Sequence, residues 1–239
     1  MVKHSPTIVI LCLFLKVLLA SPIDFLSGLL IKNNIFDDRV QIGGPIDDEF
    51  PTVEEGADVA RTLVNRESLV NVNTFTKIKD SGDSETLIPV SSMEYYADCD
   101  NDGDPYWLVI DIGSTFQNIK HGSEYTFTIR AGDHPSGEKV DENYPGGRSW
   151  SPAGSPRVNL RGTLQNVTFE NPLDLIHLEH CFVKRHPDAK WWLPSNAITP
   201  HKAHWVKFVV SGVYFVGGFG DRAYIGPIDS ELYHSAKVV

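Results

Sequence analysis

Apolar residues recur along this chain at two different spacings. Between residues 52 and 65 they fall at helical spacing, and Glu54 and Glu55 stand in the first turn, where acidic side chains favour the helix dipole. The apolar positions of this segment are Val53, Ala57, Ala60, Leu63 and Val64. The pattern predicts an amphipathic helix, after which the spacing changes to the two-residue period of strands.

Six segments after residue 68 either alternate apolar with polar residues or are apolar throughout, as strands do. They are 69–76, 87–97, 106–112, 124–130, 157–168 and 205–219. Gly162 in the fifth and Gly212 in the sixth mark bends or bulges that curl a sheet closed. The sixth segment is apolar on both faces, so we expect it to be buried on both. The pattern predicts a mainly β fold with peripheral helices, built on a six-stranded barrel.

Two connections of this barrel are long. Between the fifth and sixth strands, Asn171 and Pro172 are typical of a helix start, and Leu175, Leu178 and Phe182 form an apolar stripe. A short second segment, 186–194, follows. The loop 131–156 is rich in glycine, proline and aspartate and far exceeds the usual length of a connection. We expect that loop to be mobile or to cover one end of the barrel.

The N-terminal residues are typical of a secretory leader. Lys3 precedes an apolar run over 8–15, and the small pair Ala20-Ser21 closes the segment. Lys16 interrupts the run, which is therefore too short for a bilayer span. We predict a signal peptide over 1–20, an extended acidic leader over 21–50 and a secreted or endomembrane-lumen destination, with a vacuole or lysosome-like compartment included. The alternative for 1–20 is an uncleaved interfacial helix.

Charge and cysteine content narrow the class of protein further. The formal net charge is −10, and removal of Lys3 and Lys16 with the signal peptide makes it −12, which argues against nucleic acid or anionic lipid as a partner. Cys12 lies in the signal peptide, so Cys99 and Cys181 remain as a candidate disulfide, although a core of this size does not require one. Asn166 begins the sequon Asn166-Val167-Thr168, a candidate glycosylation site.

Several segments resemble the pyridoxamine 5'-phosphate oxidase-like, FMN-binding split barrels, and most closely their CREG-like branch. They are GADVARTLV, DPYWLVIDIGSTFQNIKHGSEYTFTI, VNLRGTLQNVT, FVKRHPDAKWW and WVKFVVSGVYFVGGFG. The resemblance covers residues 51–226. The resemblance implies a six-stranded split β-barrel domain over 51–239. It further implies a barrel that often forms a homodimer, with FMN at the subunit interface in the enzymes, whereas the CREG-like branch is thought to lack that cofactor.

The resemblance also indicates where a flavin phosphate would lie. FMN-binding relatives usually place arginine or lysine where the third strand passes into a short helix, and this chain has Ser114 and Thr115 there, with Lys120 as the nearest cation. Arg222 follows the GGFG segment 217–220 and is a further candidate for a cofactor pocket. Similar GGFG endings occur in split barrels related to haem-degrading enzymes. The phosphate grip therefore looks degraded, and we expect no cofactor, although the two hydroxyls leave FMN binding open.

Two clusters of the sequence are candidate metal sites. Residues 98–104 have the DxDxDG spacing of a calcium loop, but Val109 stands where the bidentate glutamate belongs, which favours a solvated acidic turn over weak calcium binding. Histidines and a cysteine gather further on, without the spacing of a zinc signature. They are His177, His180, Cys181, His201 and His204. We therefore predict no metal site.

The remaining candidates concern binding. Lys190, Trp191 and Trp192 are a candidate binding surface, with packing of an insertion onto the barrel as the alternative. No G-x-S-x-G, H-E-x-x-H or Walker motif is present, so hydrolase and NTPase chemistry have no support. The sequence predicts a secreted or lumenal glycoprotein, homodimeric and without catalytic residues, that binds a protein or glycan partner and has no stable membrane span. The alternative is an FMN- or haem-dependent oxidoreductase.

Overall fold

The computed structural model describes residues 51–79, 84–138, 151–199, 201–219 and 223–239. The proposed signal peptide, the leader 21–50 and Arg222 lie outside the described residues. Among the described residues, no helix is both long and apolar enough to cross a membrane.

The helix expected from the first apolar pattern is α3 (Val53–Arg66). Thr52 caps it, since its hydroxyl accepts the amide of Glu55 while the Glu55 carboxylate accepts the amide of Thr52. Ala57, Ala60, Leu63 and Val64 are fully buried in the barrel core. The helix therefore presents the predicted apolar face to the core.

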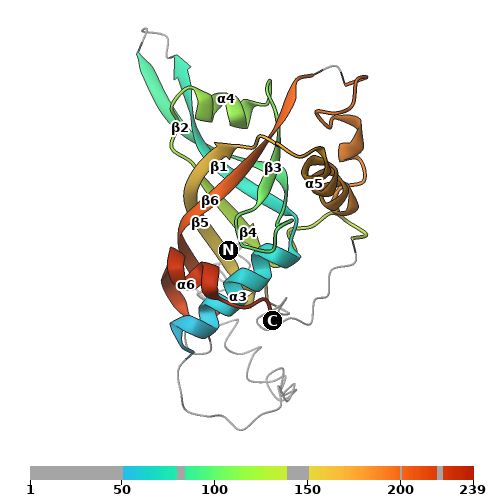
Figure 1. Ribbon diagram of the computed structural model, residues 1–239. Coiled ribbons are helices and arrows are strands. Elements are labelled where there is room, and N and C mark those ends of the chain that lie inside the picture. The colour runs from blue at the N-terminus through green and yellow to red at the C-terminus, as the bar shows by residue number, and fades with distance from the viewer. Residues whose placement is uncertain (1–50, 80–83, 139–150, 200, 220–222) are drawn as a thin grey trace, which may run out of the picture. The chain divides into compact units, whose positions relative to one another are not determined.

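Seven antiparallel strands make the sheet: β1 (Leu69–Lys79), β2 (Glu85–Ala97), β3 (Tyr106–Ile110), β4 (Thr126–Arg130), β5 (Arg157–Asn166), β6 (Ala203–Val216) and β7 (Ile225–Asp229). Their order is β3-β2-β1-β4-β5-β6-β7, and an additional pairing of β3 with β6 closes the ring (Figure 1). The six-stranded split barrel is confirmed. The short β7 and the following helix α6 (Ser230–Ser235) were not predicted.

The predicted bend in the fifth strand is a β-bulge. The register between β5 and β6 shifts between Arg161 and Gly162. A Cβ atom at Gly162 would lie 2.1 Å from the carbonyl oxygen of Val209, so only glycine permits this approach of the two backbones.

Among the described residues, two hydrophobic clusters lie on the two faces of β3 and β6. Inside the barrel, Phe127 stacks on Phe208 with ring centroids 4.0 Å apart. On the opposite face, α5 (Pro172–Arg185) and the short helix η2 (Ala189–Trp191) pack Leu178 and Phe182 against Trp205 (Figure 1). The sixth strand is buried on both faces only near its start, at Trp205 and Val206. Further along, Ser211 and Tyr214 are exposed on its outer face, so the expected burial on both faces is wrong for that part of the strand.

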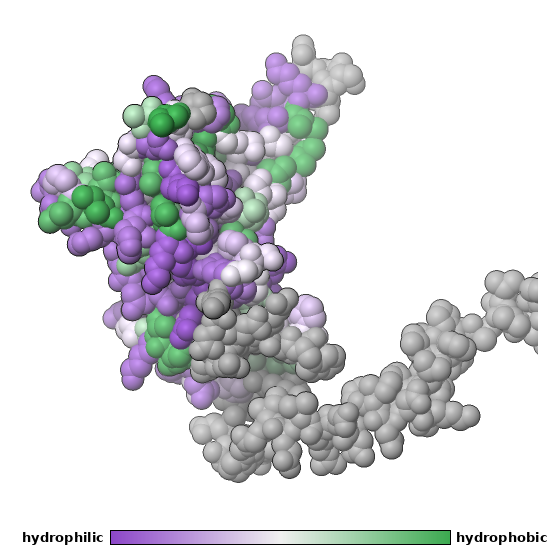
Figure 2. Space-filling model, turned by 90° about the vertical axis from the view of Figure 1, so that its right-hand side faces the viewer, coloured by the Kyte–Doolittle hydropathy of each residue, from purple (hydrophilic) through white to green (hydrophobic). Residues whose placement is uncertain are grey.

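The hairpin of β1 and β2 extends beyond the barrel as an arm (Figures 1 and 2). Strand β1 pairs with β4 only over Asn71–Asn73, and β2 pairs with β3 only at Tyr96 and Ala97. The distal half of the hairpin is therefore a two-stranded ribbon, and its side chains Ile78, Leu87 and Ile88 are exposed. Pro89 stands in β2 without an amide donor, which protects a strand edge from further pairing.

Candidate functional site

The predicted phosphate site lies at α4 (Ser114–Lys120), a helix of 7 residues between β3 and β4. Ser114 and Lys120 are exposed, whereas Thr115 is buried. The side chains of Asn118 and Thr74 join this helix to β1 through a hydrogen bond of 3.1 Å. Of the residues proposed for the cofactor, Lys120 is thus at the far end of the helix from Ser114.

A carboxylate lies behind α4. Glu94 of β2 is partly buried and lies beside Thr115 and Trp107. Burial raises the pKa of Glu94, and the polar side chains of Thr115 and Trp107 oppose that rise. The Thr115 side chain is therefore next to the Glu94 carboxylate of the protein itself. That carboxylate repels a phosphate placed at the start of α4.

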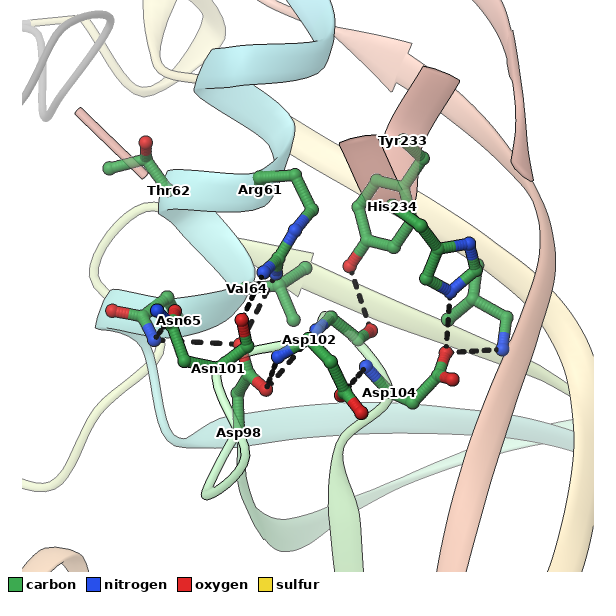
Figure 3. Close-up of polar contacts among 12 residues, drawn as sticks. Arg61, Thr62, Val64, Asn65, Asp98, Asn101, Asp102, Asp104, Tyr233 and His234 are labelled. Atoms are coloured by element: carbon green, nitrogen blue, oxygen red, sulfur yellow. Dashed lines mark hydrogen bonds and ion pairs between the residues drawn. The ribbon is translucent and has the colours of Figure 1, made fainter. Parts of the chain in front are cut away.

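The acidic turn 98–104 is held by cations from the surrounding elements (Figure 3). Asp98 is buried, and its carboxylate accepts Arg61 Nη1 of α3 at 3.2 Å as well as the amides of Asp102 and Gly103. Arg61 also donates to the carbonyl oxygen of Asn101 at 3.0 Å. Asn101 and Gly103 have positive φ angles of 54° and 90°, which forms the tight turn around the Asp98 carboxylate.

The other carboxylates of this turn have cationic partners as well. Lys207 Nζ of β6 lies 2.6 Å from Asp100 and 2.7 Å from Asp102. Partial burial disfavours the charge of Lys207, but the hydrogen bonds to both carboxylates outweigh it and raise the pKa of the ammonium. Partial burial likewise opposes the charge of Asp100, and the hydrogen bonds from Lys207 and Tyr106 lower its pKa.

Asp104 completes the arrangement at the C-terminal helix. Its carboxylate accepts the amide of Val210 at 2.8 Å and contacts His234 Nε2 of α6 at 2.9 Å (Figure 3). Tyr233 of the same helix donates to the carbonyl oxygen of Gly103. Asp98 and Asp104 have separate partners, while Asp100 and Asp102 share Lys207. The protein's own groups thus occupy the four carboxylates, and the turn is a structural junction of α3, β6 and α6.

The candidate metal ligands are also dispersed. Cys181 of α5 forms a disulfide with Cys99 of the acidic turn, so its sulfur is already bonded. His177 and His180 are exposed on α5, while His204 Nδ1 lies 2.7 Å from Asp111. Within the described ranges, no group of three or more His, Cys, Asp or Glu side chains is placed to hold a metal ion.

The structure separates the residues of the proposed binding surface. Trp191 is 63% exposed, and Lys190 Nζ lies 5.1 Å from the centre of its ring. Trp192 instead packs against Tyr95 in the second hydrophobic cluster. Asn166, the sequon residue, is exposed at the last position of β5. Lys190 and Trp191 therefore form the accessible part of this surface.

The long loop begins as an ordered segment. The carbonyl oxygen of Asp133 accepts the amides of Ser68 and Leu69, and His134 Nδ1 lies 2.6 Å from Glu67. Arg185 at the end of α5 binds Glu138 at 2.5 Å. The expected mobile or covering role of the loop thus does not extend to 131–138, and residues 139–150 lie outside the described part of the chain.

A groove on the outer face of the sheet was not predicted. It has a volume of about 600 Å³ and lies where the arm diverges from β4. Its walls come from five strands, β1, β2, β4, β5 and β6, or from residues next to them. A smaller hollow of about 430 Å³ adjoins Asp111 and His204.

The family description "CREG, beta-barrel" matches residues 51–235. The chain belongs to the CREG β-barrel family. This confirms the resemblance drawn from its segments, and it covers the whole described barrel. A search of curated proteins finds no match to this CREG-family chain.

Solved structures share the fold. The structure titled as a heme binding protein from Mycobacterium smegmatis is 20% identical with a TM-score of 0.52, over 76% of this chain and 61% of that protein. Atu2129 of Agrobacterium tumefaciens is 16% identical with a TM-score of 0.48, over 80% of this chain and 64% of that one. The CREG-family chain thus spans less than two thirds of either protein, and the likeness shows the fold alone.

Proposed function

We propose that this chain is a secreted or lumenal glycoprotein whose split barrel is a non-catalytic binding module for a protein or glycan partner. The exposed sequon at Asn166, the Cys99–Cys181 disulfide and the leader pattern of 1–20 support this location. A vacuole or lysosome-like lumen fits the same features. The acidic balance of the chain supports a partner other than nucleic acid.

The position of the Glu94 carboxylate behind α4 is the main support for the proposal that FMN does not bind. A phosphate site needs cationic or amide donors that converge on the anion. Here Thr115 is buried against Glu94, Ser114 offers one exposed hydroxyl, and Lys120 comes from the last turn of the helix. The residues present do not fit a phosphate.

The alternative is an FMN- or haem-dependent oxidoreductase. Its support is the shared fold with the heme binding protein from Mycobacterium smegmatis. Fold similarity of this degree carries no residue of a haem site to this chain. The alternative therefore depends on whether the protein takes up a cofactor.

Fluorescence titration with FMN tests the proposal, with riboflavin as the matched control because it lacks the phosphate. The expected result is that added protein leaves the fluorescence of both compounds unchanged at micromolar concentration. Saturable quenching of FMN that riboflavin does not share would show a working phosphate grip and overturn the proposal.

A further inference from the structure

The groove beside the arm is formed by the divergence of two strands. The ladder between β1 and β4 ends at Asn73 and Thr126. Beyond this pair, Phe75 and Pro89 of the arm form one wall, and Glu124 precedes β4 on the other. Its volume of about 600 Å³ lies within the range of small-molecule sites.

Asn73 and Thr126 of the groove lining belong to a closed set of hydrogen bonds, which we call the amide–hydroxyl square and which also includes Thr128 and Asn159 next to the groove. The amide nitrogen of Asn73 donates to the hydroxyl oxygens of Thr126 and Thr128 at 3.1 and 2.8 Å. The amide nitrogen of Asn159 donates to the same two oxygens at 3.3 and 3.0 Å. The four side chains therefore hold one another in place across β1, β4 and β5.

The square leaves a defined set of groups for a ligand. Each amide nitrogen uses both hydrogens, and each hydroxyl oxygen uses both lone pairs. In the groove lining, the hydroxyl hydrogen of Thr126 and the amide oxygen of Asn73 remain, which makes one donor and one acceptor side by side. Hydrogen bonds to such preorganised groups cost little ordering of the protein.

Two charged groups face the same groove from different strands. The bulge directs Arg161 outward, where its guanidinium lies over Gly212. Glu124, which precedes β4, is exposed in the lining of the same groove. In the described part of the chain, neither side chain has a hydrogen bond or ion pair from its charged group. The groove thus offers one cation and one anion and carries no net charge.

An aromatic ring completes the lining. Phe75 is 42% exposed at the edge of the groove, so its face is accessible to an apolar surface of a ligand. A ligand that matches these groups needs closely spaced donors and acceptors, an apolar face and no large charge. Saccharides have this combination, because vicinal hydroxyls alternate with C–H faces, whereas nucleotides and polyanions meet only one cation here.

We propose that this groove is a saccharide-binding site, with Asn73, Thr126 and Arg161 bound to sugar hydroxyls and Phe75 against the sugar ring. The inference rests on the proposed function as a binding module and assigns it a ligand class. The proposed ligand would contact strands of the barrel and the arm, and neither Lys190 nor Trp191 lines this groove.

The test is an array of N-glycan-derived oligosaccharides and chito-oligosaccharides, probed with the full secreted protein after removal of its own N-glycans. The strongest ligand is then titrated by calorimetry. Arg161→Ala and Phe75→Ala are each expected to weaken binding at least tenfold, and Asn73→Ala to do the same. The matched control is Asn71→Ala, two residues earlier on the same face of β1 but outside the groove. Unchanged thermal unfolding of Arg161→Ala shows that the loss is not a loss of folding.

Three outcomes would overturn the inference. If the folded protein is colourless and binds none of these oligosaccharides, the proposed non-catalytic binding function stands, but the saccharide-binding site is contradicted. Binding that survives Arg161→Ala and Asn73→Ala would place the site elsewhere. A change of mass in Arg161→Ala by light scattering would show that a second copy fills the groove. A protein that carries flavin or haem would instead contradict the proposed function itself, which separates the two failures.

Discussion

At the scale of single residues, Glu94 and His186 have environments that oppose their charged forms. Glu94 is partly buried beside Thr115 and Trp107, and His186 is fully buried between α5 and β2. Tyr95 stacks on the His186 ring at 4.3 Å, and Nε2 of the ring donates to the carbonyl oxygen of Tyr96 at 2.9 Å. The two residues give stability opposite dependences on pH.

Burial raises the pKa of Glu94 in the folded state, so the folded protein binds a proton more tightly than the unfolded chain. The folded state consequently loses stability as the pH rises from the unfolded pKa through the raised one. Glu94→Gln should remove this loss, so its stability relative to the wild type increases from acidic to neutral pH. Urea unfolding at acidic and at neutral pH measures this change in relative stability, and Glu124→Gln serves as a control at an exposed position. Parallel profiles for wild type and Glu94→Gln would contradict the assignment.

Burial lowers the pKa of His186, although the hydrogen bond to Tyr96 opposes the change. The stability that the neutral ring supports is present above the ordinary histidine pKa and is lost as the pH falls through the lowered value. His186→Gln keeps a donor toward Tyr96 but does not titrate. Thermal unfolding across acidic pH should show a smaller decline for this variant, and an equal decline would assign the acid sensitivity to other groups.

At the scale of elements, the disulfide joins the acidic turn to α5. Cys99 and Cys181 are 82 residues apart, so the bond restricts a large loop of the unfolded chain. The double variant Cys99→Ser, Cys181→Ser should lower the free energy of unfolding by about 2–5 kcal/mol. Reduced wild-type protein should match it in urea titration. Equal stability of oxidised and double-variant protein would contradict a structural role for the bond.

The elements differ in how far their sequence determines them. α3, the six barrel strands and α5 follow from periodicity and caps, because each carries an apolar pattern of its own. β7 is as short as β3 and β4, with 5 residues, but it includes Gly226 and Pro227, which weaken a strand pattern. Its place is determined by pairing with β6, a contact that no local pattern contains.

The sites were less predictable than the elements, because they too depend on contacts between residues that are far apart in the sequence. The DxDxDG spacing identified the acidic turn, but Lys207, which neutralises two of its carboxylates, is more than 100 residues away. The amide–hydroxyl square likewise joins β1 to β4 and β5, strands that are neighbours only in the closed sheet. Ser114 and Thr115 were found through the resemblance, yet the role of Glu94 behind them depends on the register of β2.

At the scale of the whole molecule, we predict a homodimer. A two-stranded ribbon is only marginally stable alone, and the distal arm exposes Ile78, Leu87 and Ile88. A second copy that covers these side chains would remove them from water. Light scattering at micromolar concentration should give twice the monomer mass, and Leu87→Ser with Ile88→Ser should shift it toward the monomer. A monomeric, folded wild type would contradict the prediction.

The central claim is that this barrel binds a partner without a redox cofactor. The visible absorption spectrum of the protein purified from a secretory host, recorded before and after addition of haem, tests it most directly. The account predicts a colourless protein with no flavin bands and no Soret band beyond that of free haem. A yellow preparation with flavin absorbance, or a shifted Soret band that saturates at one haem per chain, would contradict it.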